Sequence, residues 1–252
     1  MERKIALVTG ATSGIGWSTA LTLARMGYDL IATGRREKRL DELAKALPEG
    51  TKFLPLVFDV RNREKVFEIL GTIPEDWENI QVLVNNAGNA HGMDPIQTGN
   101  LDDWDAMMDI NVKGLLYVSK AIIPGMIERK NGIIINIGSI AGKEVYPNGN
   151  VYCGSKHAVD ALTKGMRIDL NPYGIKVIGI HPGLVETEFS EVRFKGDTER
   201  AEKVYQGYEP LLADDIAEIV EFVVNRPRHV VLADIVVLPT AQASATLVNK
   251  ES

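Results

Sequence analysis

The feature that most constrains the fold of this chain is its regular alternation of short apolar segments with amphipathic ones. Runs of Val, Ile and Leu over about six residues are typical of buried strands, and apolar residues at every third or fourth position are typical of helices. Strands are expected near residues 4–9, 28–33, 52–58, 80–84, 132–138, 175–181 and 234–238. Helices are expected near residues 14–26, 37–47, 62–71, 102–129, 152–170 and 212–225. The alternation predicts an α/β fold, a single-domain Rossmann-type doubly wound parallel sheet of about seven strands with helices on both faces.

The sequence predicts one domain over residues 1–252. It contains no Pro/Ser-rich linker, repeat or low-complexity tract, and α/β folds often use this much chain for one domain. The polar stretch 186–208 is long for a connection, which is typical of a lid over the strand ends. Residues near 239–252 are expected to form a C-terminal tail.

Charge and cysteine content exclude several classes of protein. The formal net charge is −6, without a dense Lys/Arg block, so no nucleic-acid partner is expected. We find no signal peptide and no segment expected to span a membrane. Cys153 is the single cysteine, which forbids an internal disulfide and suits a cytoplasmic location. No metal site is expected, because the histidines lack metal-ligand spacing: His91, His157, His181 and His229.

A glycine-rich turn follows the first expected strand. The segment Gly10-Ala11-Thr12-Ser13-Gly14-Ile15-Gly16 leads from that strand directly into a helical stretch. Glycines let the backbone approach a pyrophosphate, whose charge is met by the N–H groups at the start of the helix. An ordinary strand-to-helix turn is the alternative, but strand before and helix after is the context that favours a dinucleotide site.

A serine, a tyrosine and a lysine form the second motif. Ser139 ends the apolar run 132–138, at the carboxyl end of an expected strand, where open α/β sheets bind ligands. Tyr152 and Lys156 share one face of the following helix. We expect the ammonium to lower the pKa of the phenol, so that Tyr152 can serve as a general acid and base. Taken alone, such a pair is more often a solvated helix face.

At this point the chain resembles the short-chain dehydrogenases/reductases. Their motifs occur here in the same order: Thr9-Gly10-x-x-x-Gly14-x-Gly16, Asn85-Asn86-Ala87-Gly88, Asn111, Ser139, Tyr152-x-x-x-Lys156 and Pro182-Gly183. A narrower likeness, to the NADP-dependent 3-hydroxy acid (serine or allo-threonine) dehydrogenases, rests on Pro182–Val185, Glu188–Asp197, Thr33–Arg36 and Asp59–Arg63. The resemblance covers almost the whole chain.

The resemblance implies roles for individual residues. Ser139 would bind the substrate oxygen, Tyr152 would transfer its proton, and Lys156 would hold the nicotinamide ribose. Asn111 would bind a water on the proton path, although a local role within its helix is the alternative. The remaining cofactor contacts implied are Gly10, Thr12, Ser13, Gly14, Ile15, Gly16, Asp59, Val60, Asn86, Ala87, Gly88, Pro182, Gly183, Val185 and Thr187.

Two arginines indicate which dinucleotide is bound. Enzymes that use NAD usually carry an acidic residue at the end of the second strand, whereas here Arg35 and Arg36 follow that strand. Guanidinium groups match a 2′-phosphate by bidentate hydrogen bonds, which favours NADP. Glu37 begins the next helix and is expected to face water.

The expected substrate is a small hydroxy acid or oxo acid. Arg193 in the lid is the candidate for binding the carboxylate, although a solvent-facing arginine is the alternative. A ketoreductase of carrier-bound 3-oxoacyl groups would need a basic patch, for which Lys164, Arg167 and Lys195 are thin support. A non-catalytic NADP-sensing regulator is a third reading, but it would be expected to lack a catalytic residue.

A homo-oligomer, dimer or tetramer, is expected by analogy with the family. Helical stretches 102–129 and 152–170 carry apolar residues beyond one face, which a monomer would struggle to bury. Those residues include Met107, Met108, Leu115, Leu116 and Tyr117.

Overall fold

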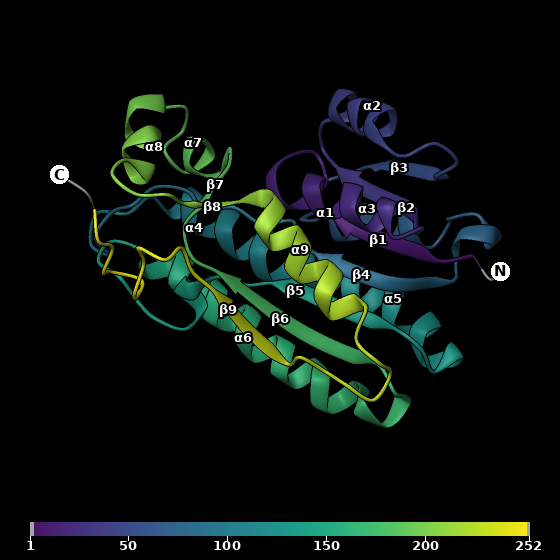
Figure 1. The fold of residues 1–252 in the computed structure, drawn as a ribbon. Helices are drawn as coiled ribbons and strands as arrows, with labels where there is room; N and C mark the ends of the chain where they lie inside the picture. Colours follow the sequence, from purple (N-terminus) through teal and green to yellow (C-terminus); the bar gives the residue numbers. More distant parts are fainter. Residues whose placement is uncertain (1–2, 251–252) are drawn as a thin grey trace.

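Seven parallel strands form the central sheet of the protein. A computed structural model describes residues 3–250. The strand order is β3-β2-β1-β4-β5-β6-β9, and every neighbouring pair runs parallel (Figure 1). This confirms the predicted fold. The strands are β1 (Ile5–Thr9), β2 (Asp29–Gly34), β3 (Phe53–Val57), β4 (Ile80–Asn85), β5 (Ile133–Ile137), β6 (Lys176–Pro182) and β9 (Asp234–Val237).

Helices cover both faces of this sheet and bury two apolar cores. One core takes its helical side chains from α1 (Gly14–Arg25), α2 (Glu37–Ala46) and α9 (Ala213–Val224). The other takes them from α3 (Arg63–Leu70), α5 (Leu115–Arg129) and the end of α6 (Asn150–Leu170). The central strands are buried on both faces, which explains their continuous apolar runs.

The direction of the chain reverses at β1. From β1 the chain moves outward through β2 and β3, and β4 then returns to pair on the other side of β1. Open α/β sheets bind ligands at such a switch point, outside the carboxyl ends of the strands. The glycine turn after β1, Asn86 after β4 and Ser139 after β5 all lie at this edge.

A single long helical segment, Leu101–Arg129, contains an irregularity at its centre. Helix α4 (Leu101–Met108) passes through a π-helical stretch, Asp109–Gly114, before α5 begins. By length and composition the segment could cross a membrane, but 44% of its most apolar window is buried inside the molecule. Core helices of soluble proteins pass the same test, so this is weak evidence for a membrane span.

The stretch expected to form a lid contains two short helices, α7 (Phe189–Arg193) and α8 (Thr198–Tyr205). Its two ends are held together by a parallel ladder of two residues each, β7 (Val185–Glu186) with β8 (Leu211–Leu212). Tyr205 strengthens this base, because its hydroxyl donates to Val185 O at 2.9 Å. The lid is therefore a folded subdomain on a narrow base.

Residues near the C-terminus are anchored rather than free. Gln242 is buried, and its Oε1 accepts a hydrogen bond from Leu184 N at 2.9 Å. A β-bridge between Gln242 and Val248 folds this segment back on itself. The expected tail thus supports the loop that follows β6.

Candidate active site

The glycine turn leaves no room for side chains at its closest approaches. A Cβ at Gly16 would lie 2.4 Å from both Gly10 O and Asn86 Nδ2. Gly14 has φ +51°, a conformation that favours glycine. The Asn86 amide donates to Thr9 O at 2.9 Å and to Gly10 O at 3.1 Å. Asn86 therefore fixes the turn from β4, which is a structural role that the sequence does not reveal.

The start of α1 fits a dinucleotide phosphate. Ser13 is the N-cap, and within the described chain its side chain makes no capping hydrogen bond to the first turn. Those backbone N–H groups and the helix dipole therefore face the end of the turn, which is the geometry that binds phosphate. The glycine cradle and this helix end together suit the pyrophosphate of NADP.

The arginines expected to bind the 2′-phosphate differ in their surroundings. Arg36 donates from Nη2 to Ser13 Oγ at 2.7 Å and to Thr12 Oγ1 at 3.1 Å. Arg35 is more exposed, and its Nη1 lies 3.9 Å from Asp59 Oδ2. Arg36 therefore lies on the glycine turn, whereas Arg35 lies beside the expected adenine site. Glu37 is exposed, as predicted.

The expected adenine contacts lie after β3 and β4. The Asp59 carboxylate receives Arg61 Nη2 at 2.7 Å, and although partial burial opposes it, this hydrogen bonding lowers the pKa of Asp59. Val60 is buried, and a Cβ at Gly114 would lie 2.7 Å from its Cγ2. Ala87 donates its backbone N–H to Thr9 Oγ1 at 3.0 Å. These contacts place β1, β3 and β4 residues around one side of the site.

Ser139 and Tyr152 come together as expected. Ser139 leaves β5 with an extended backbone, and its Oγ accepts from Ala141 N at 3.1 Å. It also hydrogen-bonds with the Tyr152 side chain. Tyr152 projects from the first turn of α6 and is 8% exposed. The two hydroxyl groups can therefore contact one substrate oxygen.

The pKa of Tyr152 differs from the expectation. Burial raises it above the ordinary value for a phenol, and the hydrogen bond from Ser139 opposes this only in part. Lys156 Nζ lies 6.0 Å from the centre of the Tyr152 ring and donates to Ile137 O at 3.0 Å. Burial lowers the pKa of Lys156 to about 8. The predicted lowering of the phenol pKa by the ammonium is wrong for this arrangement, because desolvation of both groups outweighs a cation at that distance.

Asn111 lies in the π-helical stretch and faces the site. Its Nδ2 donates to Asn89 O at 2.8 Å and to Ser155 Oγ at 3.0 Å, and its Oδ1 accepts from Asn89 N at 2.9 Å. A Cβ at Gly88 would meet both Asn111 Oδ1 and Lys156 Nζ, at 2.9 and 3.6 Å. Asn111 and Lys156 thus flank one glycine. π-Helical turns are frequent at functional sites.

The loop after β6 is held in place by the C-terminal segment. A Cβ at Gly183 would lie 2.2 Å from Gln242 Oε1. Pro182 ends β6, Val185 is buried in β7, and Thr187 packs over Gly14. The expected nicotinamide contacts therefore lie opposite the glycine turn, and Gln242 is a supporting residue that the sequence analysis missed.

Arg193, at the end of α7, reaches Tyr152. Its guanidinium carbon lies 5.6 Å from the centre of the Tyr152 ring and 5.5 Å from that of Tyr146. Its Nε donates to Gly92 O at 3.2 Å, and among residues 3–250 its buried Nη2 has no hydrogen-bond partner. A pocket beside Tyr152 is lined by Arg193 together with residues of α4 and the loop before α6. A donor in this position is available to an anion.

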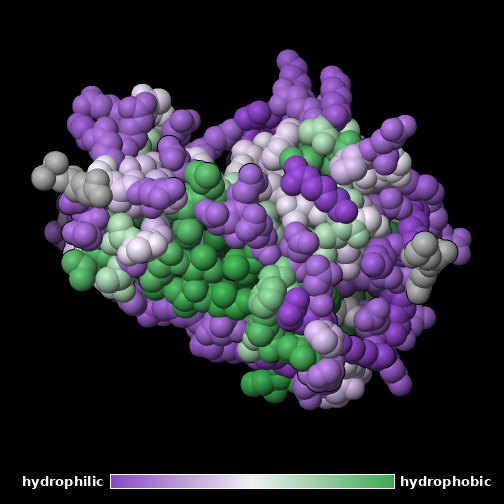
Figure 2. All heavy atoms as spheres, in the orientation of Figure 1, coloured by the Kyte–Doolittle hydropathy of each residue, from purple (hydrophilic) through white to green (hydrophobic). Residues whose placement is uncertain are grey.

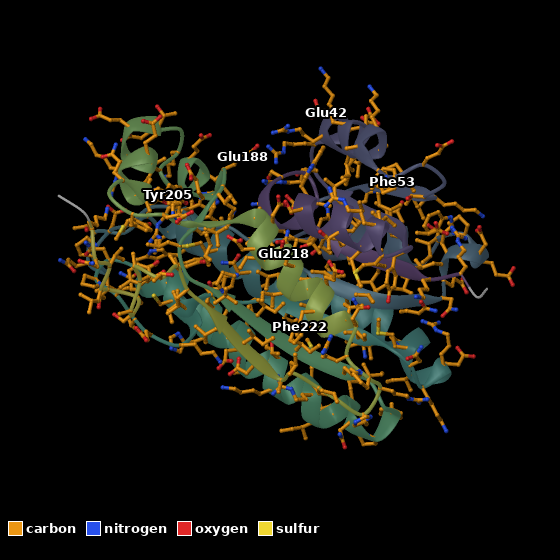
Figure 3. The ribbon with its side chains drawn as sticks, in the orientation of Figure 1. Glu42, Phe53, Glu188, Tyr205, Glu218 and Phe222 are labelled. Atoms are coloured by element: carbon orange, nitrogen blue, oxygen red, sulfur yellow. The ribbon has the colours of Figure 1, made fainter. Side chains whose placement is uncertain are left out.

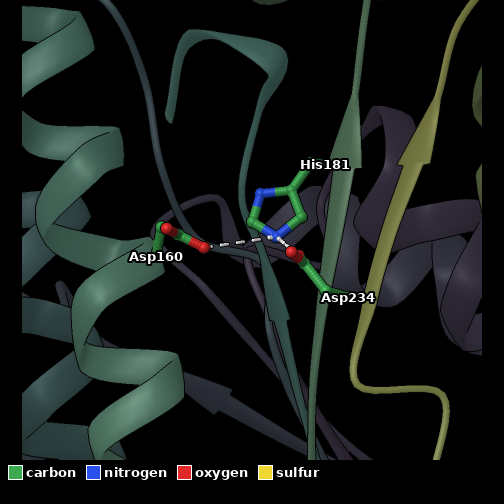
Figure 4. A group of neighbouring side chains, drawn as sticks. All are labelled: Asp160, His181 and Asp234. Carbon is green, nitrogen blue, oxygen red and sulfur yellow. Dashed lines mark ion pairs between the residues drawn. The ribbon is translucent and has the colours of Figure 1, made fainter. Parts of the chain in front are cut away.

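A second cluster lies between α6, β6 and β9, and its His181 packs against Gly138, next to Ser139. His181 Nε2 lies 2.6 Å from Asp234 Oδ1 and 3.8 Å from Asp160 Oδ1 (Figure 4). Lys143 Nζ donates to the same two carboxylates, at 2.7 Å from each. Histidine spacing in the sequence did not indicate this group. Lys164 Nζ also lies 2.6 Å from Asp160 Oδ2, so two ammonium groups offset the two carboxylates and the cluster is an ion-pair network.

Comparisons with known proteins agree with this geometry. The model of the short chain dehydrogenase family matches residues 4–198. The chain is 45% identical over 244 residues to the NADP-dependent 3-hydroxy acid dehydrogenase YdfG of Escherichia coli strain K12, covering 96% of this chain and 98% of the relative. It is 41% identical over 249 residues to sulfoacetaldehyde reductase 2 of Chromohalobacter salexigens, covering 98% and 99%.

One solved structure resembles this one closely. The closed form of serine dehydrogenase complexed with NADP+ superimposes with a TM-score of 0.92 at 45% sequence identity. The match covers 96% of this chain and 98% of the other. The similarity therefore includes the lid as well as the sheet.

Proposed function

Because this chain belongs to the short-chain dehydrogenase family, we propose that it is an NADP-dependent oxidoreductase of small 3-hydroxy acids and their 3-oxo acids. Candidate substrates are of the serine, allo-threonine, 3-hydroxyisobutyrate or 3-hydroxypropionate type. Relatives named for 3-hydroxy acid and serine dehydrogenase support this class. The observation that carries the proposal is the Arg193 guanidinium beside Tyr152.

The substrate carbon and the carboxylate are close together in such molecules. Only one carbon separates the reacting carbon from the carboxylate carbon in a 3-hydroxy acid. A cation that binds the carboxylate must therefore lie within a few ångströms of the proton-transfer group. Arg193 meets this requirement, and its unpartnered Nη2 offers a charge-assisted hydrogen bond.

Proton transfer in the proposed reaction belongs to Ser139 and Tyr152. NADP, when bound, accepts or supplies the hydride. Ser139 donates a hydrogen bond to the substrate oxygen, and the Tyr152 hydroxyl gives that oxygen its proton in reduction. In oxidation Tyr152 must first lose its own proton, because only the phenolate can take the proton of the substrate hydroxyl.

Lys156 and Asn111 support this transfer. Lys156 would hold the ribose hydroxyl groups, because its buried ammonium lies next to Gly88 at the switch point of the sheet. Asn111 flanks the same glycine and would order a water that links Lys156 to solvent. The cofactor turn, Arg35 and Arg36 would hold the adenosine half of NADP.

Two alternatives are less well supported. The cations suggested for docking a carrier protein are already engaged: Lys164 with Asp160, Lys195 with Asp103 and Arg167 with Val177 O. A basic docking patch is therefore weak, which disfavours the ketoreductase of carrier-bound substrates. All four catalytic candidates are present around one site, which disfavours a regulator without turnover.

A substrate panel tests the proposal directly. NADPH absorbance would be followed with serine, allo-threonine, 3-hydroxyisobutyrate and a 3-hydroxy ester that lacks the carboxylate. Sulfoacetaldehyde belongs in the panel because a relative carries that name. Turnover of the free acids well above the ester is expected. Preference for the neutral ester, or for a carrier-linked 3-oxoacyl group, would contradict the proposal.

We also propose a cytoplasmic homo-oligomer, dimer or tetramer. Only some of the apolar residues suggested for the interface are available to a partner. Met107 and Leu115 are buried within the chain, whereas Met108 and Leu116 are 37% and 36% exposed. Figure 2 shows a large apolar area on the face that carries α9 and β9. Phe222 on α9 and Val236 on β9 are exposed large apolar residues. A monomeric mass by light scattering at micromolar concentration would contradict association.

A further inference from the structure

The cluster around Asp160 joins the turn of residues 139–143, here called the Ser139 turn, to α6 and to β9. Lys143 ends this turn, directly after the 3₁₀ segment Ile140–Gly142. Its Nζ donates to Asp160 Oδ1 on α6 and to Asp234 Oδ2 on β9, at 2.7 Å in each case. One ammonium therefore connects the chain that follows β5 with a helix and with the edge strand of the sheet.

Asp160 lies on the face of α6 that carries the proposed catalytic residues. Tyr152, Lys156 and Asp160 follow one another at intervals of four positions, which places their side chains along one stripe of the helix. The ion pair between Asp160 and Lys143 therefore holds the Ser139 turn against the stripe from which Tyr152 hydrogen-bonds with Ser139.

The Ser139 turn packs closely on α6 and then leads into exposed chain. A Cβ at Gly142 would lie 2.6 Å from Lys156 O, so the two backbones touch at this point. Glu144 and Val145, which follow Lys143, are exposed. Lys143 therefore fixes the end of the turn at the point where the chain leaves the interior.

His181 holds the other side of the Ser139 turn. Its ring lies against Gly138, which directly precedes Ser139, and a Cβ at Gly138 would be 2.3 Å from His181 Nδ1. His181 Nε2 lies 2.6 Å from Asp234 Oδ1 (Figure 4). Burial lowers the pKa of His181 below its usual value, and the Lys143 ammonium adds to this effect, so the ring is neutral at ordinary pH. The ring therefore contributes packing to the cluster, while the ammonium groups contribute the positive charge.

Burial distinguishes this cluster from the ion pairs of the lid. The Lys143 and Asp160 side chains are 19% and 13% exposed. Glu188, between the lid and α2 (Figure 3), accepts from Arg36 Nη1 at 2.8 Å, but these two side chains are 35% and 46% exposed. Exposed ion pairs are screened by water and contribute little, whereas loss of one partner of a buried pair leaves a poorly solvated charge. The pair between Lys143 and Asp160 is therefore the one suited to fix a position.

We infer that Lys143 is a positioning residue, which keeps Ser139 within hydrogen-bonding distance of Tyr152 through its ion pair with Asp160. Lys143 acts through Ser139 and takes no part in proton transfer itself. Without the ion pair the Ser139 turn is free to move away from α6, and the substrate oxygen loses the aligned hydrogen bond that Ser139 supplies. This inference rests on the proposed function of Ser139 and Tyr152.

A double-mutant cycle tests this path, because the effects of residues that act through one another are not additive. Reduction of NADP with serine or 3-hydroxyisobutyrate, whichever is oxidised faster, would be measured for Ser139→Ala, Lys143→Met and the double variant. Ser139→Ala should lower kcat by about 10²–10³-fold, and Lys143→Met should lower it by about tenfold. In the Ser139→Ala background, Lys143→Met should change kcat by less than about twofold.

Lys164→Met is the matched control. Lys164 Nζ lies 2.6 Å from Asp160 Oδ2, but both residues are on α6, so this variant removes a cation from the same carboxylate without releasing the Ser139 turn. Its kcat should stay within about twofold of the wild-type value.

A second variant protects the test against loss of folding. Lys143→Met leaves the carboxylates of Asp160 and Asp234 without their shared cation, whereas Lys143→Met/Asp234→Asn removes one of these carboxylates as well. The second variant restores the balance of charge but still lacks the ion pair to the Ser139 turn. Its kcat should therefore fall as far as that of Lys143→Met.

The outcomes separate the positioning role from the proposed function. An equal effect of Lys143→Met with and without Ser139 would overturn the inference, because Lys143 would then not act through that serine. A wild-type kcat in both Lys143 variants would also overturn it, as would an equal loss in Lys164→Met. Near-native turnover by Ser139→Ala would contradict the proposed function of Ser139, and the positioning role would fall with it.

Hydrogen exchange supplies a readout that does not depend on turnover. Ala141 N donates to Ser139 Oγ at 3.1 Å, and Gly142 N donates to Ser139 O at 2.8 Å. Both amides should exchange faster in Lys143→Met than in the wild type or in Lys164→Met, because the turn is no longer held on α6. Unchanged protection of residues 139–143 in Lys143→Met would contradict the positioning role.

Discussion

The framework that holds the proposed catalytic residues and the proposed lid over residues 186–208 are built in opposite ways. Tyr152 and Lys156 are buried on α6, and Ser139 follows the buried strand β5, so each is fixed by the core of the sheet. The lid consists of two short helices on a two-residue ladder, and it meets the rest of the site through ion pairs, single hydrogen bonds and the packing of Phe189 against Tyr152. We therefore expect proton transfer to depend on the framework, and selection of the substrate to depend on contacts made by the lid.

The largest effect is expected at the centre of the framework. Tyr152→Phe removes one oxygen from a buried ring that packs 5.7 Å from Phe189, so the fold should persist. Loss of positioned proton transfer should lower kcat by about 10²–10⁴. Steady-state kinetics and NADP binding by fluorescence would be measured together. A folded variant that binds NADP and turns over at a near-native rate would remove Tyr152 from the mechanism.

The pH dependence tests the same framework. Because burial raises the pKa of Tyr152, the phenolate needed for oxidation should be scarce at neutral pH. The kcat/KM of the oxidation should therefore increase about tenfold for each unit of increasing pH. Lys156, with a pKa of about 8, is charged below that pH and loses its charge above it. The kcat/KM of the reduction should therefore be constant up to pH 8 and fall at higher pH. Profiles in both directions from pH 6 to 10 would report the coupled site. An oxidation rate that is already level below pH 8 would show that a cation lowers the pKa of the phenol after all.

Arg36 is expected to have the next largest effect. Arg36→Ala should raise KM for NADP by about 10- to 100-fold and leave KM for NAD nearly unchanged, because it removes charge-assisted hydrogen bonds to the phosphate. Arg35→Ala is the matched comparison, and its effect should be smaller because Arg35 is more exposed and lies beside Asp59. Equal effects of Arg36→Ala on both cofactors would contradict its assignment to the 2′-phosphate.

On the lid, Arg193→Met should lower kcat/KM for hydroxy acids by about tenfold or more. A neutral alcohol or ketone should be little affected, because it has no carboxylate for the guanidinium to bind. Both substrates would be assayed on one preparation. An equal loss for both would show that Arg193 supports the lid, through its hydrogen bond to Gly92 O, and does not bind charge.

The sequence predicts the framework well and the lid poorly. Each strand of the sheet lies within one or two residues of its expected range, because a buried parallel strand is a continuous apolar run that local composition reveals. Ser139, Tyr152 and Lys156 come together because strand ends and helix starts have fixed places in such a sheet.

Features that arise from contacts between distant segments were not predictable. Glu188 meets Arg36 across 152 positions, and Gln242 meets Leu184 across 58, without any local signal. The predicted direction of the Tyr152 pKa shift was wrong for a related reason. Burial of the phenol depends on the packed structure and not on its spacing from Lys156 in the sequence. The two lid helices are only five and eight residues long, which is too short for apolar periodicity in the sequence to identify them.

The smallest expected effect is on stability, and it compares two helix N-caps, one in the framework and one in the lid. Two helix N-caps make the same bond: Asn62 Oδ1 accepts from Lys65 N at 3.0 Å on α3, and Asp197 Oδ1 accepts from Arg200 N at 3.0 Å on α8. Replacing either cap by alanine should cost its helix about 1 kcal/mol. Because α3 packs on the sheet, Asn62→Ala should lower the global Tm by about 2–4 °C. Asp197→Ala should leave Tm nearly unchanged and speed hydrogen exchange only within residues 198–205, since the lid can open while the sheet stays folded. A global Tm shift of the same size for both variants would show that lid and framework unfold as one unit, and would remove the physical basis for assigning selection to the lid.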